Sequence, residues 1–269
     1  MEKANRQARR IALTKMLADH PNQLFSLGHF SSLFGAAKST LSEDIEAVRQ
    51  ALADFGLGRL ETVSGAAGGV RLVPAMTDKA ARALLVSLAD KLAAPERIIP
   101  GGFLYMSDIL FSPQLMAGVG ELFLSRFAAA APDLIVTVET KGIPLAFATA
   151  RAFNLPLVTV RRGSRVTEGT AVSINYVTGS SRRIQTMSLP RRAVPSGARA
   201  LIIDDFMKAG GTARGMADLI GEVGATVAGI GVLVATAEPA DKLVDSYTPL
   251  LILGSVDEHN KKTDIRPAL

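Results

Sequence analysis

The sequence predicts a two-domain α/β protein, in which a small helical domain precedes a larger domain built on a mainly parallel sheet flanked by helices. Three observations support this prediction. A chain of 269 residues has room for about two domains of ~150 residues each. The N-terminal part carries helical patterns and one pair of short strand-like runs. The remainder alternates apolar strand-like and helix-like segments, which is typical of a parallel sheet. The predicted domains are residues 1–74 and 75–269.

The composition excludes several classes of protein. Apolar residues make up 48% of the chain, yet no apolar run approaches the ~20 residues that cross a bilayer. The charged N-terminus is not followed by an apolar signal core, so we expect a cytoplasmic protein without a membrane partner. The chain has no cysteine and only three scattered histidines, so disulfides and a zinc centre are not expected.

The N-terminal domain shows three helical stretches followed by a hairpin. Two short β-like runs flank the glycine-rich segment 64–69, as in a hairpin with a flexible tip. Three helices and a hairpin in so short a stretch indicate a winged helix. The predicted helices are 4–17, 26–33 and 39–55, and the predicted strands are 59–63 and 70–73.

A winged helix predicts contact with double-stranded DNA. Segment 38–49 would be the recognition helix, with Ser39 or Thr40 as its cap. The acidic residues of this segment count against a strongly basic reading face, although acids near a helix start also suit the helix dipole. A small dimerisation or protein-binding module is the alternative. The DNA contacts predicted from the first helix, the recognition helix and the hairpin are Arg6, Arg9, Arg10, Lys38, Ser39, Thr40, Ser42 and Arg71.

The second domain begins after a linker near 73–76, with a helix at 78–94. Its later segments alternate between strand and helix, except for two strands that look like a projecting hairpin, 170–175 and 184–189. The other predicted strands are 134–138, 157–160, 201–204, 227–235 and 250–253, and the other predicted helices include 143–153 and 213–223.

Segment 201–212, LIIDDFMKAGGT, is the most informative motif. Gly210 and Gly211 let the backbone approach an anion, and the N–H groups at a helix start are unpaired donors at the positive end of the dipole. Asp204 and Asp205 suit the vicinal hydroxyls of a ribose, or a magnesium ion shared with phosphates. The motif therefore predicts a site for a phosphorylated sugar. An ordinary turn with surface aspartates is the alternative.

A second strand-to-helix turn lies in segment 136–144, VTVETKGIP. Thr140, Lys141 and Gly142 follow a β-rich run and precede a helix, which is another arrangement that can bind an anion. Taken alone, this turn is explained equally well as a structural connection. Its position ahead of the first motif favours a shared phosphate site.

Positive charge is concentrated between Arg151 and Arg199, where nine arginines accompany one acid, Glu168. A solvated basic face is the simpler explanation. The alternative is a surface that meets the phosphates of a small ligand or of nucleic acid. The arginines predicted to surround the pocket and also to face DNA are Arg161, Arg162, Arg165, Arg182 and Arg183.

The segment 201–212 resembles the 5-phosphoribosyl-1-pyrophosphate (PRPP) signature of type I phosphoribosyltransferases, and 139–142 resembles their pyrophosphate loop. With the winged helix and the segment 166–192, these motifs resemble the purine operon repressor family of Gram-positive-type bacteria over essentially the whole chain. The resemblance implies a type I phosphoribosyltransferase fold. It also implies a homodimeric repressor of purine synthesis genes that binds PRPP without turning it over.

The implied effector is PRPP, with or without magnesium, and no catalytic residue or resident metal is assigned. A purine nucleotide such as guanosine tetraphosphate is the competing ligand, for which Tyr105 and Phe206 are candidate stacking partners. For Tyr105 a plain core role is the favoured alternative. The implied effector site comprises Tyr105, Thr140, Lys141, Gly142, Asp204, Asp205, Phe206, Met207, Lys208, Ala209, Gly210, Gly211 and Thr212.

Two departures from the transferase pattern agree with a non-catalytic site. Lys208 stands where transferases prefer a small residue, and Ala209 stands where they usually place a threonine, so one phosphate contact is lost. The rival prediction is an active purine phosphoribosyltransferase with an added N-terminal module. An RNA-binding attenuator of the same fold is a third alternative, but it lacks the winged-helix pattern.

Overall fold

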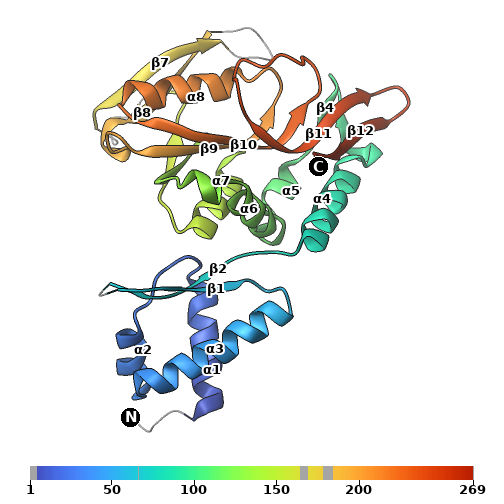
Figure 1. The fold of residues 1–269 in the computed structure, drawn as a ribbon. Helices are drawn as coiled ribbons and strands as arrows, with labels where there is room; N and C mark the ends of the chain where they lie inside the picture. Colours follow the sequence, from blue (N-terminus) through green and yellow to red (C-terminus); the bar gives the residue numbers. More distant parts are fainter. Residues whose placement is uncertain (1–4, 66, 164–168, 178–183, 269) are drawn as a thin grey trace. The chain divides into compact units, whose positions relative to one another are not determined.

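The computed structural model describes residues 5–65, 67–163, 169–177 and 184–268. The chain divides into two compact units, with the main division between Thr77 and Asp78. Figure 1 shows the first unit as helices with a hairpin and the second as a sheet with helices. The predicted fold class, an α/β protein with a helical N-terminal domain, is therefore confirmed.

The N-terminal unit is a winged helix of three helices and one antiparallel hairpin. Phe25 forms an isolated antiparallel bridge with Val70, which joins the start of the second helix to the hairpin. Buried apolar side chains from all three helices and both strands form one core. Its elements are α1 (Arg6–Asp19), α2 (Leu27–Phe34), α3 (Lys38–Asp54), β1 (Arg59–Val63) and β2 (Gly69–Val73).

The predicted cap of the recognition helix is wrong. Helix α3 begins at Lys38, so Ala37 is the N-cap and makes no side-chain capping bond. Ser39 and Thr40 consequently lie inside the first turn, where a side chain cannot cap the helix that contains it. By contrast, the side chain of Ser26 accepts the N–H of His29 and caps α2.

The second unit is built on a six-stranded sheet of order β12-β11-β10-β9-β5-β6. All neighbours in it are parallel except β11 and β12, which form an antiparallel pair at one edge. The edge strand β12 was not predicted from the sequence. The strands are β5 (Leu134–Val138), β6 (Leu157–Val160), β9 (Arg199–Met207), β10 (Thr226–Thr236), β11 (Thr248–Asp257) and β12 (Lys262–Pro267).

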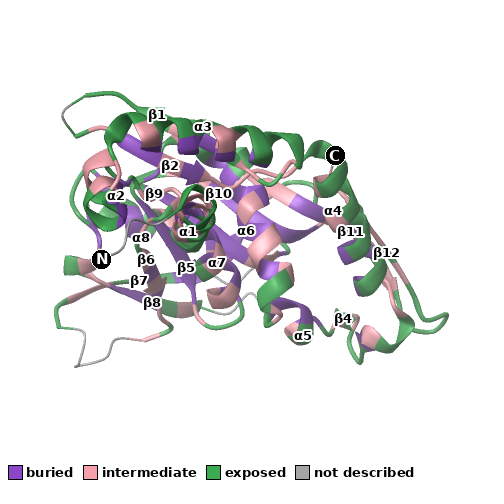
Figure 2. Ribbon diagram, turned by 90° about the horizontal axis from the view of Figure 1, so that it is seen from below, coloured by how far each residue is buried: buried purple, intermediate pink, exposed green. Residues whose placement is uncertain are grey.

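Helices cover both faces of this sheet (Figure 1). Helix α8 packs on one face, while α6 lies so close to the other that a Cβ at Gly231 would stand 2.7 Å from the ring of Phe123. The central strands are buried between these layers (Figure 2). The helices are α4 (Asp78–Leu92), α5 (Ser107–Leu110), α6 (Pro113–Phe127), α7 (Ile143–Phe153) and α8 (Gly211–Glu222), with short 3-10 turns η1 (Pro95–Arg97), η2 (Ala128–Ala130) and η4 (Arg191–Ala193).

Two small hairpins complete the unit. The pair β7 (Ala171–Val177) and β8 (Ile184–Pro190) packs on α8, and the predicted hairpin is therefore confirmed up to its tip, which lies outside the described residues. The pair β3 (Ile98–Ile99) and β4 (Phe103–Leu104) was not predicted. Among the described helices, none is long and apolar enough to cross a membrane.

Candidate phosphate-binding site

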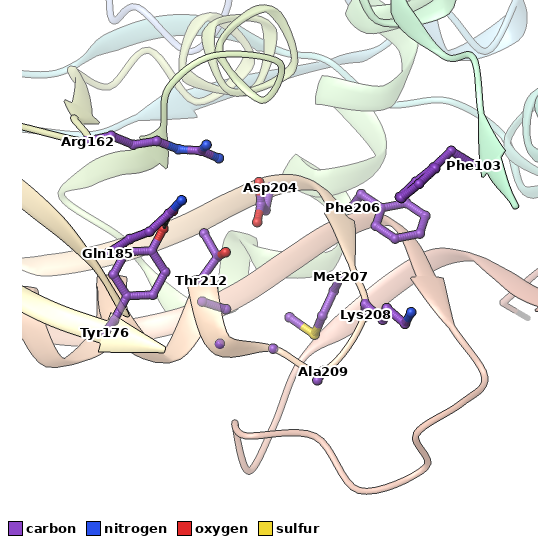
Figure 3. Close-up of a pocket in the computed structure, with 13 residues that line it drawn as sticks. Phe103, Arg162, Tyr176, Gln185, Asp204, Phe206, Met207, Lys208, Ala209 and Thr212 are labelled. Atoms are coloured by element: carbon purple, nitrogen blue, oxygen red, sulfur yellow. Dashed lines mark hydrogen bonds between the residues drawn. The ribbon is translucent and has the colours of Figure 1, made fainter. Parts of the chain in front are cut away.

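A cavity of about 330 Å³ lies where β9 gives way to α8 (Figure 3). This is the carboxyl end of a parallel strand, where open α/β sheets bind their ligands. Most of its lining comes from the predicted segment 201–212. The lining residues are Phe103, Arg162, Tyr176, Gln185, Asp204, Phe206, Met207, Lys208, Ala209, Gly210, Gly211, Thr212 and Ala213.

The turn into α8 is suited to an anion. Gly210 adopts a left-handed conformation with φ of 83°, which an L side chain would adopt only at a cost. It is the N-cap of α8 and offers no side chain to the helix, so the first N–H groups of the helix have no capping side chain. Gly211, Thr212 and Ala213 line the cavity at this helix start, where the dipole favours negative charge.

The two aspartates at the end of β9 form a coupled acidic pair. Asp204 is buried, and the backbone N–H of Asp205 donates to its Oδ1 at 3.0 Å. Burial, together with the charge of Asp205, raises the pKa of Asp204 well above its usual range. Burial also raises the pKa of Asp205, although Asp204, Lys141 and Arg162 act in the opposite direction. A carboxyl pair held this way can accept hydrogen bonds from hydroxyl donors.

The second predicted turn meets this acidic pair. A Cβ at Gly142 would lie 2.6 Å from Thr137 Oγ1 and 3.4 Å from Asp204 Oδ1, so the glycine allows a close approach. The buried hydroxyl of Thr137 has no hydrogen-bond partner within the described part of the chain. The peptide bond between Glu139 and Thr140 is cis. The structure therefore brings the turns of β5 and β9 together at the aspartates.

Arg162 is the predicted arginine that lines the cavity. The carboxylate of Glu139 accepts its backbone N–H at 2.7 Å and also lies 3.5 Å from the guanidinium of Arg161. In Figure 3 the side chain of Arg162 extends toward the region of Asp204. Three further arginines of the predicted surface, Arg165, Arg182 and Arg183, lie outside the described residues.

The predicted stacking residue Tyr105 does not line the cavity, and its alternative role in the core is also wrong. Its side chain is 48% exposed, whereas Phe103 lines the cavity together with Phe206. Strand β4 ends at Leu104, so Tyr105 lies outside the strand and its side chain does not follow the alternation of Phe103 and Leu104.

Tyr176 and Gln185 were missed as lining residues. They are directly opposite on β7 and β8, and the hydroxyl of Tyr176 donates to Gln185 Oε1 at 2.9 Å. Burial raises the pKa of Tyr176. The sequence predicted the hairpin that carries them, but it did not indicate which face of the hairpin packs against α8.

Three predicted DNA contacts in α1 converge on one carboxylate. Asp44 of α3 is fully buried and lies 2.9 Å from guanidinium nitrogens of both Arg9 and Arg10. Arg6 approaches Asp44 and Glu43 at 3.6 Å. The arginines therefore also join α1 to α3, a role that the sequence did not indicate.

A second cavity, of about 570 Å³, lies between the starts of α2 and α3 and the hairpin. Lys38 and Ser42 line it, and Ser39 is exposed on the adjoining turn. Arg71 on β2 pairs with Glu61 at 2.8 Å, which lowers the pKa of Glu61. Across the described ranges, no group of three or more His, Asp or Glu side chains is placed to hold a metal ion.

A winged helix joined to a phosphoribosyltransferase-type domain is the class that this fold and site define. Residues 5–74 match the family model described as "Bacterial purine repressor, N-terminal", and residues 106–262 match "Phosphoribosyl transferase domain". The chain is similar to the purine biosynthesis transcriptional repressor PurR of Bacillus subtilis, with 48% identity over 98% of this chain and 93% of that protein. It therefore belongs to the PurR family of purine biosynthesis transcriptional regulators.

Another relative agrees with this assignment, and solved structures share the fold of the larger domain. The purine biosynthesis transcriptional activator PurR of Lactococcus lactis is 36% identical over 97% of this chain and 96% of its own length. Adenine phosphoribosyltransferase from Saccharomyces cerevisiae shares the fold with a TM-score of 0.54 and 18% identity, covering 62% of this chain and 97% of its own. The Rhodothermus marinus enzyme has a TM-score of 0.53 and 22% identity, covering 62% and 96%.

Proposed function

We propose that the protein is a DNA-binding repressor of purine biosynthesis genes whose operator affinity falls when PRPP occupies the cavity at the end of β9. The likeness to a purine repressor over 98% of the chain supports the regulatory role. The observation that carries the choice of ligand is the meeting of two anion-suited turns at a pair of aspartates. PRPP is a ribose with phosphate groups at both ends, so its phosphates match the two turns and its hydroxyls match the aspartates.

Each part of PRPP has a corresponding group in the site. The N–H groups at the start of α8 and the hydroxyl of Thr212 receive the 5-phosphate. Asp204 and Asp205 accept the ribose hydroxyls, and the turn at 140–142 receives the diphosphate. The carboxylate pair also fits a magnesium ion brought by the diphosphate, because carboxylate oxygens are preferred magnesium ligands.

A purine nucleotide can compete for the same cavity. Phe103 and Phe206 both line it, and aromatic faces of this kind suit a planar base. A guanosine tetraphosphate would place its phosphates on the same N–H groups that PRPP uses. The two ligands would then exclude one another.

The ligand controls DNA affinity only if it binds the free and DNA-bound forms unequally. Arg162 supplies a route, since it lines the cavity within an arginine-rich stretch. An anionic ligand would hold its guanidinium and reduce the positive field available to DNA phosphates. PRPP would therefore act as an inducer.

The DNA-binding surface is proposed on the winged helix, around the exposed start of α3 and the hairpin. Lys38, Ser42 and the glycine-rich hairpin tip border one cavity there. A twofold dimer would present two such units, so the operator should contain paired half-sites.

Transferase activity is not part of the proposal. Ala209 supplies no hydroxyl to a phosphate, and Lys208 places a charged side chain where transferases prefer a small residue. An active purine phosphoribosyltransferase remains the rival. Base-dependent release of pyrophosphate from PRPP would support the rival.

The test is fluorescence anisotropy of the full-length protein on DNA from upstream of purine synthesis genes, titrated with and without PRPP. Saturable binding that PRPP relieves is expected. DNA affinity unchanged at saturating PRPP, with ligand binding confirmed separately, would reject the proposed coupling. Because relatives include a repressor and an activator, a transcription assay on the same DNA should show reduced transcript when the protein is added.

A further inference from the structure

Lys242 and Leu243, which follow β10, contact carbonyl groups of segment 208–212, which we call the phosphate loop. The Nζ of Lys242 donates to the carbonyl oxygen of Lys208 at 2.6 Å and to that of Thr236 at 2.8 Å. The backbone N–H of Leu243 donates to the carbonyl oxygen of Ala209 at 2.9 Å. Two successive carbonyl groups of the loop are thus held by adjacent residues.

These bonds fix the direction of the loop's N–H groups. In a planar trans peptide, the C=O and the N–H of the same unit point in opposite directions. Because the carbonyls of Lys208 and Ala209 point to segment 242–243, the N–H groups of Ala209 and Gly210 point away from it. Both Ala209 and Gly210 line the cavity, where those donors can meet an anion.

The support is in close contact with the loop. A Cβ at Gly210 would lie 3.3 Å from the backbone nitrogen of Leu243 and 3.6 Å from Cβ of Lys242. The ammonium of Lys242 is partly buried, and this burial lowers its pKa. A positive charge held behind the loop is less screened by water than one on the surface.

We propose that Lys242 is a positioning residue of the phosphate site. It holds the Lys208 carbonyl so that the loop's N–H donors face a phosphate monoester, and it adds positive charge behind them. The inference rests on the proposed function for the nature of the ligand, but it requires no coupling to DNA.

The test measures binding of ribose 5-phosphate and PRPP to the full-length protein by titration calorimetry. The variant Lys242→Met should weaken binding of both ligands about tenfold or more, because the Lys208 carbonyl loses the ammonium that holds it and the positive charge behind the loop is removed. Lys242→Arg should restore most of the affinity, and Lys242→Gln, a neutral donor, should be intermediate. The matched control is Lys262→Met, which removes an exposed lysine of β12 and should leave both affinities unchanged.

Circular dichroism and a cooperative melting transition without ligand should show that Lys242→Met is folded, which separates damage to the site from loss of fold. If the Met variant does not fold, the Gln and Arg variants carry the comparison. Wild-type ribose 5-phosphate affinity in the neutral variants would overturn the inference and leave the proposed function standing. Lys242-dependent binding without any effect of PRPP on DNA would uphold the inference and reject the proposed coupling. A wild-type protein that binds neither ligand would overturn both.

Discussion

Arg9 and Asp44 join α1 to α3 through a guanidinium and a carboxylate 2.9 Å apart, with side chains that are 11% and 1% exposed. Arg10 binds the other carboxylate oxygen at the same distance. A carboxylate buried this completely depends on its partners, because it has lost its hydration. The arginines of α1 therefore have a role in the fold before any role in binding DNA.

The variant Asp44→Ala should lower the free energy of unfolding by about 3 kcal/mol, since it removes the buried carboxylate that joins Arg9 and Arg10 of α1 to α3. Urea denaturation followed by circular dichroism measures this change. The neighbouring variant Glu43→Gln is the control, because its side chain is 69% exposed and should be almost neutral. Equal stabilities of the two variants would contradict the assigned role of Asp44.

Variants of Arg6 and Arg9 should separate the effect on DNA binding from the effect on stability. Arg6 is 61% exposed, so Arg6→Ala should leave stability nearly unchanged and, if it contacts phosphate, reduce the salt slope of DNA binding by about one. Arg9→Ala should instead destabilise the winged helix. Anisotropy at several salt concentrations, with urea melts of the same samples, distinguishes them. An unchanged salt slope in Arg6→Ala would remove Arg6 from the DNA surface.

The variant Asp204→Asn should be more stable than the wild type at neutral pH. The folded protein raises the pKa of Asp204, so it binds the proton more tightly than the unfolded chain does. The associated stability is present below the unfolded pKa and is lost as pH rises through the folded value. Asparagine does not ionise, so the variant does not lose stability as the pH rises. Its melting temperature should exceed the wild type's by about 2–4 °C for each kcal/mol gained.

The same variant should lose ribose binding, because the asparagine side chain replaces one acceptor oxygen of the carboxyl group with an NH2 group that can only donate. Melting curves between acidic and neutral pH, together with PRPP titrations, measure both effects. Asp90→Asn, at an exposed position of α4, is the control. A stability difference that does not vary with pH would show that Asp204 titrates alike in both states.

Arg162→Ala should weaken PRPP binding about tenfold or more, since its guanidinium lines the cavity and a charge-assisted contact would be lost. Arg192→Ala removes an exposed arginine from the same basic stretch and should have no effect on PRPP. Titration calorimetry compares the two. Equal losses would mean that the overall charge of the stretch, rather than the position of Arg162, determines ligand affinity.

Gly142→Ala should abolish PRPP binding, because its Cβ would fall 2.6 Å from Thr137 Oγ1 beside the aspartates. Gly221→Ala provides the contrast. That glycine lies near the end of α8 with no atom within 4 Å of its added Cβ, so alanine should stabilise the helix by about 0.5 kcal/mol. Thermal melts and PRPP titrations test the pair. Normal PRPP affinity in Gly142→Ala would remove this turn from the site.

Much of the fold was predictable because its signals are local. The strands 134–138 and 157–160 and the helix 143–153 have the predicted bounds, since each is an uninterrupted apolar or periodic run bounded by turn residues. The glycines and aspartates of segment 201–212 likewise predicted a strand-to-helix turn. In the structure this turn lines a cavity. The edge strand β12 was missed because its charged residues, which alternate with Thr263, Ile265 and Pro267, resemble a surface loop until β11 pairs with it.

The sequence by itself determined the order of elements, the two anion-suited turns and the family to which the chain belongs, because each is encoded in neighbouring residues. Only the tertiary structure decided which distant side chains meet. It placed Phe103 rather than Tyr105 at the cavity, brought Lys242 behind the phosphate loop and directed the arginines of α1 to Asp44. Such contacts depend on how separate elements pack, and packing is set by the whole chain rather than by any local pattern.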